Sequence, residues 1–199
     1  MYKYAFFYNY NNLKDLIEDA CQYKFEINHN QPYLFETIIN SDNTEDIIFF
    51  HQEDTIKIRF IPEKLIFVVF INKVKYLGNL KFLNRYTPLN ITTIINNNSF
   101  QKKLVKNLTK IVLELSTSYE KEHFELIGNY LSDSIYLEGI DYLNNNSNLI
   151  IQEYIFQPPG YKHTIKIKNP NRLEFNSKIH DTEKEIFFNN FLTYIKEVK

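Results

Sequence analysis

The sequence is poor in several residue types: it has one cysteine, four glycines and no tryptophan in 199 residues. The single cysteine, Cys21, excludes an internal disulfide and any zinc site that needs several cysteines. Four scattered glycines provide no phosphate-binding loop, and the short motifs of zinc proteases, serine hydrolases and dinucleotide-binding proteins are missing. We therefore expect a non-enzymatic protein that needs no cofactor and no metal.

Long apolar runs and an excess charge are also missing. The longest apolar run, residues 65–71, is far shorter than the roughly 20 residues of a membrane-spanning helix. The N-terminus lacks the basic flank and continuous apolar stretch of a signal peptide, so we expect a cytoplasmic protein. A formal net charge of −1 gives no general attraction to nucleic acids or acidic membranes, which disfavours both as partners.

The residues that are abundant are asparagine, isoleucine, lysine, tyrosine and phenylalanine. The standard genetic code gives them A/T-rich codons, so their excess indicates an AT-rich genome rather than a function. With 44% hydrophobic residues, the chain can bury a sizeable core. We expect one domain over residues 1–199, with a possible subdomain break near 157–161, where two prolines and a glycine interrupt the chain.

The N-terminus carries an aromatic residue at every second position. These residues are Tyr2, Tyr4, Phe6, Tyr8 and Tyr10. Because strand side chains alternate between two faces, the pattern predicts a strand with one aromatic face. That face is either a wall of the core or a binding surface, since a buried tyrosine hydroxyl usually needs a hydrogen-bond partner.

Hydrophobic periodicity predicts the other elements. Period-two alternation and β-branched residues predict strands at 24–29, 33–39, 46–51, 55–61, 65–71, 73–77, 135–142, 149–156, 163–168 and 172–175. Helical spacing of apolar residues predicts helices at 13–23, 99–116, 119–132 and 181–198, the last being amphipathic and capped by Asp181 or Thr182. Short polar turns favour antiparallel pairing of the N-terminal strands.

These elements predict an α+β fold. Its mainly antiparallel sheet, with an N-terminal meander, would be packed by about four helices, including the C-terminal amphipathic helix.

The histidines and the cysteine give no convincing catalytic group. His51, Glu53 and Asp54 are interpreted as a solvated turn between two strands. The alternative, a zinc-deaminase site, would need a cysteine pair downstream, and that pair is absent. His180 and Asp181 are interpreted as the start of the last helix. Cys21 is interpreted as inert packing.

Positive side chains alternate with apolar ones in the strand at 55–61. Lys57 and Arg59 would share the outer face of the sheet, and Lys73 with Lys75, and Lys166 with Lys168, repeat the pattern. A lysine-rich face with aromatic residues nearby is one way to bind single-stranded nucleic acid. This remains an alternative, disfavoured by the scarcity of arginine.

The stretch over residues 122–142 combines acidic residues with tyrosines and could bind a basic protein. The candidate partner-binding residues are Glu122, Glu125, Tyr130, Asp133, Tyr136, Glu138, Asp141 and Tyr142. The opposing interpretation is a solvated helix face with tyrosines in the core.

We therefore expect a protein-binding module, for example an immunity protein that neutralises a toxin by covering its site. The alternative is a structural subunit of a larger assembly, such as a secretion or phage-like machine, with the stripe from Tyr2 to Tyr10 as a seam between subunits. A homo-oligomer is compatible with either interpretation.

Overall fold

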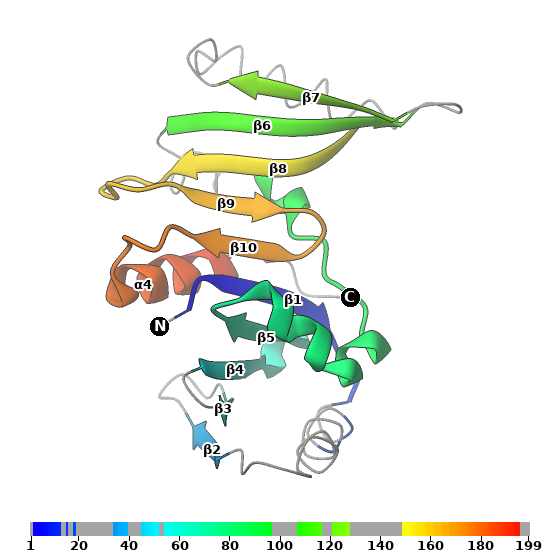
Figure 1. Cartoon of the computed structure of the whole chain (residues 1–199), viewed down its shortest axis with the longest axis vertical. Helices are drawn as coiled ribbons and strands as arrows, with labels where there is room; N and C mark the ends of the chain where they lie inside the picture. Colours follow the sequence, from blue (N-terminus) through cyan, green and yellow to red (C-terminus); the bar gives the residue numbers. More distant parts are fainter. Residues whose placement is uncertain are drawn as a thin grey trace. The chain divides into compact units, whose positions relative to one another are not determined.

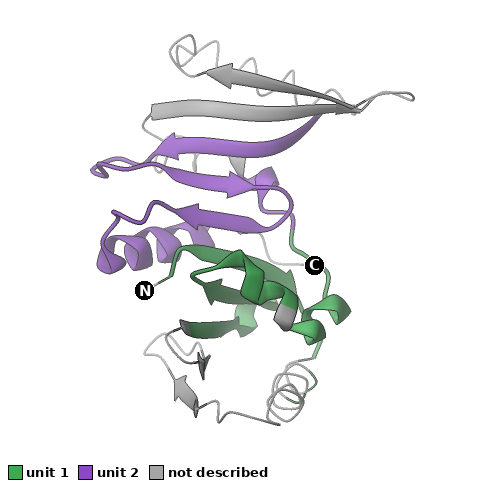
Figure 2. Ribbon diagram, viewed as in Figure 1, with its two compact units in different colours: residues 1–89, 196–199 green, residues 90–195 purple. Residues whose placement is uncertain are grey.

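The computed structural model describes residues 2–12, 15, 18, 34–39, 45–51, 54–96, 107–116, 121–127 and 149–195. Within them, α4 (Asp181–Leu192) is the one α-helix with complete bounds, and the other long elements are strands (Figure 1). The chain divides into two compact units, residues 1–89 with 196–199 and residues 90–195 (Figure 2). Each unit is described by itself.

The described residues of the first unit form five strands in the order β2-β3-β4-β5-β1. Their bounds are β1 (Tyr4–Asn9), β2 (Leu34–Ile39), β3 (Glu45–His51), β4 (Asp54–Ile61) and β5 (Ile66–Ile71). Each neighbouring pair is antiparallel. β4 and β5 are joined by the 3-10 turn η1 (Pro62–Lys64), after which Leu65 adopts a left-handed backbone with φ 51°.

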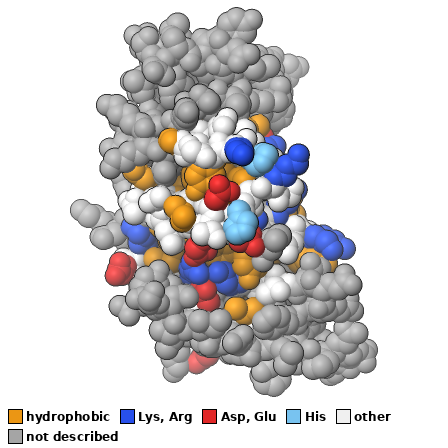
Figure 3. All heavy atoms as spheres, turned by 90° about the vertical axis from the view of Figure 1, so that its left-hand side faces the viewer, with side chains coloured by type: hydrophobic (Ala, Val, Ile, Leu, Met, Phe, Trp, Pro, Cys, Tyr) orange, Lys and Arg blue, Asp and Glu red, His pale blue; other side chains and the backbone are white. Residues whose placement is uncertain are grey.

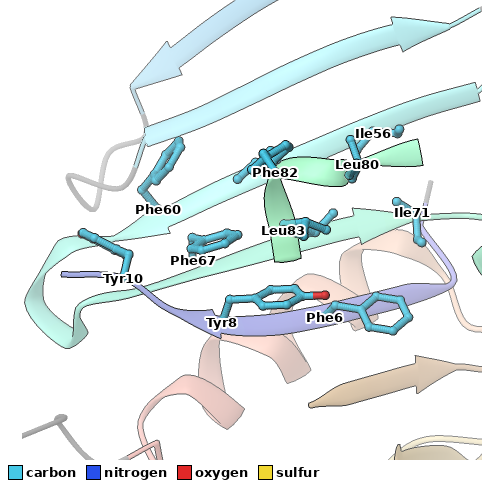
Figure 4. Packing of buried hydrophobic residues seen from close by; sticks show 12 residues of the cluster. Phe6, Tyr8, Tyr10, Ile56, Phe60, Phe67, Ile71, Leu80, Phe82 and Leu83 are labelled. Carbon is cyan, nitrogen blue, oxygen red and sulfur yellow. The ribbon is translucent and has the colours of Figure 1, made fainter. Parts of the chain in front are cut away.

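One face of this sheet is covered by a chain segment that follows β5. The 3-10 helices η2 (Val74–Asn79) and η3 (Lys81–Arg85) bring Leu80, Phe82 and Leu83 against the strands (Figure 4). The aromatic stripe of β1 provides part of the opposing wall. Tyr8 stacks on Phe67 of β5, with ring centroids 5.2 Å apart. Three members of the stripe are therefore core residues: Phe6, Tyr8 and Tyr10.

The other face of the same strands is buried as well. Ala5 and Phe7, which alternate with the aromatic stripe, are fully buried, and β5 is buried at each of its positions. A continuous apolar run is what a strand with two buried faces requires. The burial pattern therefore explains why residues 66–71 are apolar without alternation.

In the part of the second unit that the structure describes, five strands follow the order β10-β9-β8-β6-β7, again antiparallel at each pair. Their bounds are β6 (Asn107–Ser116), β7 (Lys121–Ile127), β8 (Leu149–Gln157), β9 (Ile165–Lys168) and β10 (Arg172–Phe175). The 3-10 helix η4 (Thr92–Asn96) precedes them.

Helix α4 packs through a small aromatic cluster. Phe187 lies 5.9 Å from Phe156 of β8 and 6.1 Å from Phe175 of β10, measured between ring centroids, and it stacks with Phe191 of its own helix. Phe187 is almost fully buried. Burial of such a side chain is worth about 1.5–3 kcal/mol, so this cluster holds the helix on the unit.

The start of α4 has a complete capping box. The Nδ1 atom of His180 accepts a hydrogen bond from the Thr182 backbone, and the Glu183 carboxylate accepts one from the His180 backbone. The prediction that His180 and Asp181 mark the start of the helix is confirmed, but the capping residue is His180 rather than Asp181 or Thr182.

The predicted α+β domain packed by about four helices is wrong. The structure is mostly sheet, and two of the predicted helices, 99–116 and 119–132, contain the strands β6 and β7. The register between β6 and β8 shifts between Leu108 and Lys110, and again between Val112 and Leu113. The first of these shifts places the extra residue Thr109 in β6 and interrupts its period-two alternation, so the apolar residues of this strand acquire the spacing of a helix.

The smaller differences have local causes. Residues predicted as a strand at 73–77 form η2, because four alternating residues are too short a pattern to separate a strand from a 3-10 turn. Of the helix predicted at 13–23, the structure describes Asp15 and Glu18, and both are helical. The strands predicted at 24–29 and 135–142 lie outside the described residues.

The other predicted strands are observed within a few residues of their expected ends, and the strand at 172–175 matches β10. The boundary between the two units lies at residues 89 and 90, while residues 157–161 lie inside the second unit. The single domain inferred from the sequence stays a prediction.

Candidate functional site

The predicted acidic and tyrosine-rich surface is only partly described. Glu122 and Glu125 belong to strand β7, where they are paired with Leu115 and Val112 of β6. Their assignment to a common helical face therefore fails. The other six candidates lie outside the described residues: Tyr130, Asp133, Tyr136, Glu138, Asp141 and Tyr142.

The basic pair of β4 is buried, which corrects the predicted outer face. Lys57 is 9% exposed, Arg59 6%, and Asp46 of β3, which contacts both, 4%. Arg59 donates two hydrogen bonds to the Asp46 carboxylate, of 2.8 Å from Nε and 3.0 Å from its terminal nitrogen. The Lys57 ammonium lies 3.4 Å from the same carboxylate. Bidentate geometry of this kind makes a strong, orientation-specific pair.

Aromatic rings complete the surroundings of these cations. The Lys57 ammonium lies 4.8 Å from the centre of the Phe70 ring and 5.3 Å from that of Tyr2, and Arg59 lies 5.8 Å from Phe70. Cation–π contacts at this range partly replace the lost hydration of a buried charge. This cluster is internal structure, so it offers no surface on which nucleic-acid bases and phosphates could bind.

The cations of β9 lie in a second, more exposed network. Glu153 of β8 pairs with Lys168 and lies 3.6 Å from Lys166, and Lys168 lies 3.9 Å from Glu174 of β10. Burial works to raise the pKa of Glu153, but the hydrogen bond and charge of Lys168, with Lys166, outweigh it and hold that pKa below its usual value. The charges of the two carboxylates and two ammonium groups cancel within this network. We therefore interpret it as a set of ion pairs between neighbouring strands rather than as a binding surface.

Figure 3 shows one face of the molecule, on which the described acidic and basic side chains are interspersed among hydrophobic and other atoms. The described side chains on this face form no large patch of one charge sign. Partner recognition there would depend on local geometry rather than on a broad electrostatic field.

A pocket of about 480 Å³ opens in the first unit, at the end of β1. Three segments line it: the end of β1 with the residues after it, the helical residues further along, and the end of η3. The lining residues are Asn9, Tyr10, Asn11, Asn12, Asp15, Glu18, Arg85, Tyr86 and Thr87. The volume falls within the range of roughly 300–1,000 Å³ that is typical of ligand sites.

Backbone hydrogen bonds fix two of these segments against each other. The Asn9 N–H donates to the Thr87 carbonyl, and the Tyr10 N–H donates to the Leu65 carbonyl, each with 3.0 Å between nitrogen and oxygen. The Tyr86 N–H donates to Leu83 and ends η3. The end of the strand and the exit of η3 thus form a fixed wall.

The aromatic lining of the pocket is anchored in the core. The Tyr10 ring lies 6.4 Å from Phe67, and Tyr86 meets the same Phe67 ring edge to face at 5.1 Å, measured between centroids. Tyr10 is 4% exposed, while Tyr86 is half-buried. Both rings are therefore held by core packing while lining the pocket.

The polar lining contains charges of both signs. The Oδ1 atom of Asn9 is buried and accepts no hydrogen bond from the described part of the chain. Leaving such an acceptor unpaired costs about 1–3 kcal/mol. Asp15 and Glu18 are exposed, as is Arg85, so the described lining residues carry two carboxylates and one guanidinium, with a formal charge of −1.

The pocket lining combines polar, charged and aromatic side chains. The described lining residues include no histidine, cysteine, serine or lysine, the side chains that most often serve as nucleophiles or paired bases. It offers hydrogen-bonding groups, charges and aromatic surface instead. His180 caps α4.

Sequence reasoning missed this pocket. In the sequence alone, Asn11 and Asn12 have the position of helix caps before residues 13–23, and nothing marks Arg85 as a pocket residue. The usable signal was local: a run of asparagines directly after a strand, followed by two carboxylates three residues apart on a helix. Nothing in the sequence connects that run to residues 85–87, which only the fold brings beside it.

In the described ranges, none of the helices has both the length and the apolar character needed to cross a membrane. The same ranges contain no group of three or more histidine, cysteine, aspartate or glutamate residues arranged to hold a metal ion. Comparison of the chain with protein-family models and with curated proteins finds no match.

Proposed function

We propose that this chain is a non-enzymatic protein-binding module whose partner presents a basic surface. The observation that carries the proposal is the pocket at the end of β1, whose described lining residues combine a net negative charge with tyrosine rings. Tyrosine is enriched in protein interfaces, and a ring already held by core packing loses little conformational entropy on binding. Acidic groups would attract a basic partner and fix its orientation.

A concrete form of this function is a cytoplasmic immunity protein that neutralises a toxin by covering its active surface. Such an inhibitor needs no catalytic residue, only a complementary surface that excludes the substrate of the toxin. The acidic stretch of the sequence, from Glu122 to Tyr142, is a second candidate surface for the same partner.

The test is recovery of the partner from native cells. The tagged chain is purified at moderate salt, the bound proteins are identified by mass spectrometry, and the intact complex is weighed by native mass spectrometry. We expect one stoichiometric partner with a basic surface. Recovery of the chain alone, as a monomer or as an oligomer of itself, would contradict the proposal.

Charge reversal then locates the interface. The double variant Asp15→Lys with Glu18→Lys should weaken the complex strongly if the pocket is the contact, whereas Glu122→Lys with Glu125→Lys should do so if the acidic stretch is. Glu63→Lys, at an exposed position outside the pocket lining, is the matched control. An affinity that none of these variants changes would remove both surfaces from consideration.

The two alternatives have less support in the described residues. Phe6, Tyr8 and Tyr10 are core residues, so these members of the stripe are not exposed as a seam between subunits. Lys57 and Arg59 are buried with Asp46, so they are not exposed for nucleic acid. No specific observation favours either function.

A further inference from the structure

We draw no further inference here: the strongest candidate, the exposed surface of η2 on which the Lys73 and Lys75 ammonium groups lie 5.8 and 5.3 Å from the centre of the Tyr76 ring, carries nothing, because these cations already contact that ring and nothing in the described part of the chain shows which partner would cover the surface.

Discussion

Strands β4 and β9 have nearly the same local sequence, but the cationic side chains of the two strands differ in burial. The first contains Ile56-Lys57-Ile58-Arg59 and the second Ile165-Lys166-Ile167-Lys168, with isoleucines facing the core in both. The β4 cations are buried, whereas the side chains of Lys166 and Lys168 keep 34% and 24% of their exposure. The same alternation therefore leads to an internal ion cluster in one strand and to a half-exposed network in the other.

The difference comes from the neighbouring strands. Across β4 lie Asp46 of β3 on one side and the apolar Val68 and Phe70 of β5 on the other. Across β9 lie acidic residues on both sides, Glu153 of β8 and Glu174 of β10. Whether an alternating strand has one solvated face thus depends on strand pairing that its own sequence does not contain.

The largest expected effect on the free energy of unfolding concerns the packing of α4 on the strands of the second unit. Phe187→Ala should lower the free energy of unfolding by about 3–5 kcal/mol, because it leaves a cavity among Phe156, Phe175 and Phe191. Urea denaturation followed by circular dichroism measures the change. The adjacent Ile186 is 55% exposed, so Ile186→Ala should change stability by less than about 0.5 kcal/mol. Similar losses for the two variants would refute the packing of α4 described above.

The next effect separates the two ion clusters directly. Asp46→Ala removes the carboxylate that Lys57 and Arg59 share at a buried position, and it should cost about 3 kcal/mol or more of unfolding free energy. Glu153→Ala, in the half-exposed network, should cost about 1 kcal/mol or less. Equal costs in matched urea titrations would mean that burial does not distinguish the two strands.

A triple variant sharpens this test. Asp46→Leu with Lys57→Met and Arg59→Met replaces the carboxylate and both cations by apolar side chains, and it should recover part of the stability that Asp46→Ala loses. A triple variant as unstable as the single one would show that the ion cluster itself, rather than an uncompensated charge, determines the cost.

Acid should weaken the β9 network. The pKa of Glu153 in the folded protein lies below its ordinary value of 4.5, so its contribution is present above about pH 4.5 and is lost as the pH falls through the folded-state pKa. The stability difference between the parent and Glu153→Gln should therefore shrink by about 0.5–1 kcal/mol between pH 6 and pH 3. A difference that stays constant over this range would argue against the ion pair with Lys168.

The smallest expected effect on stability concerns the N-terminal cap of α4. His180 caps α4 with a long hydrogen bond of 3.4 Å to the Thr182 backbone. Serine is a better N-cap, so His180→Ser should raise stability by about 0.5 kcal/mol, and His180→Ala should lower it by a similar amount. Thermal unfolding of the two variants side by side gives the sign of each change. A His180→Ser variant that melts below His180→Ala would exclude the capping role.

Sequence reasoning succeeded where a strand has regular alternation and failed where the sheet departs from it. Residues 172–175 alternate cleanly and were placed correctly, whereas the register shifts of β6 gave its apolar residues a helical spacing. The Tyr2 to Tyr10 pattern predicted a strand, but the choice between core wall and surface needed η3 in place. The pocket could not be predicted, because Asn9 and Arg85 meet only through the fold.

The burial of Lys57 has a practical consequence for chemical labelling. Reagents that acylate amines reach exposed side chains such as Lys73, Lys75 and Lys81 directly, but they reach Lys57 only when β4 transiently separates from its neighbours. The rate at which Lys57 gains an acyl group, read by mass spectrometry against those three internal references, therefore reports how often this part of the sheet opens under native conditions.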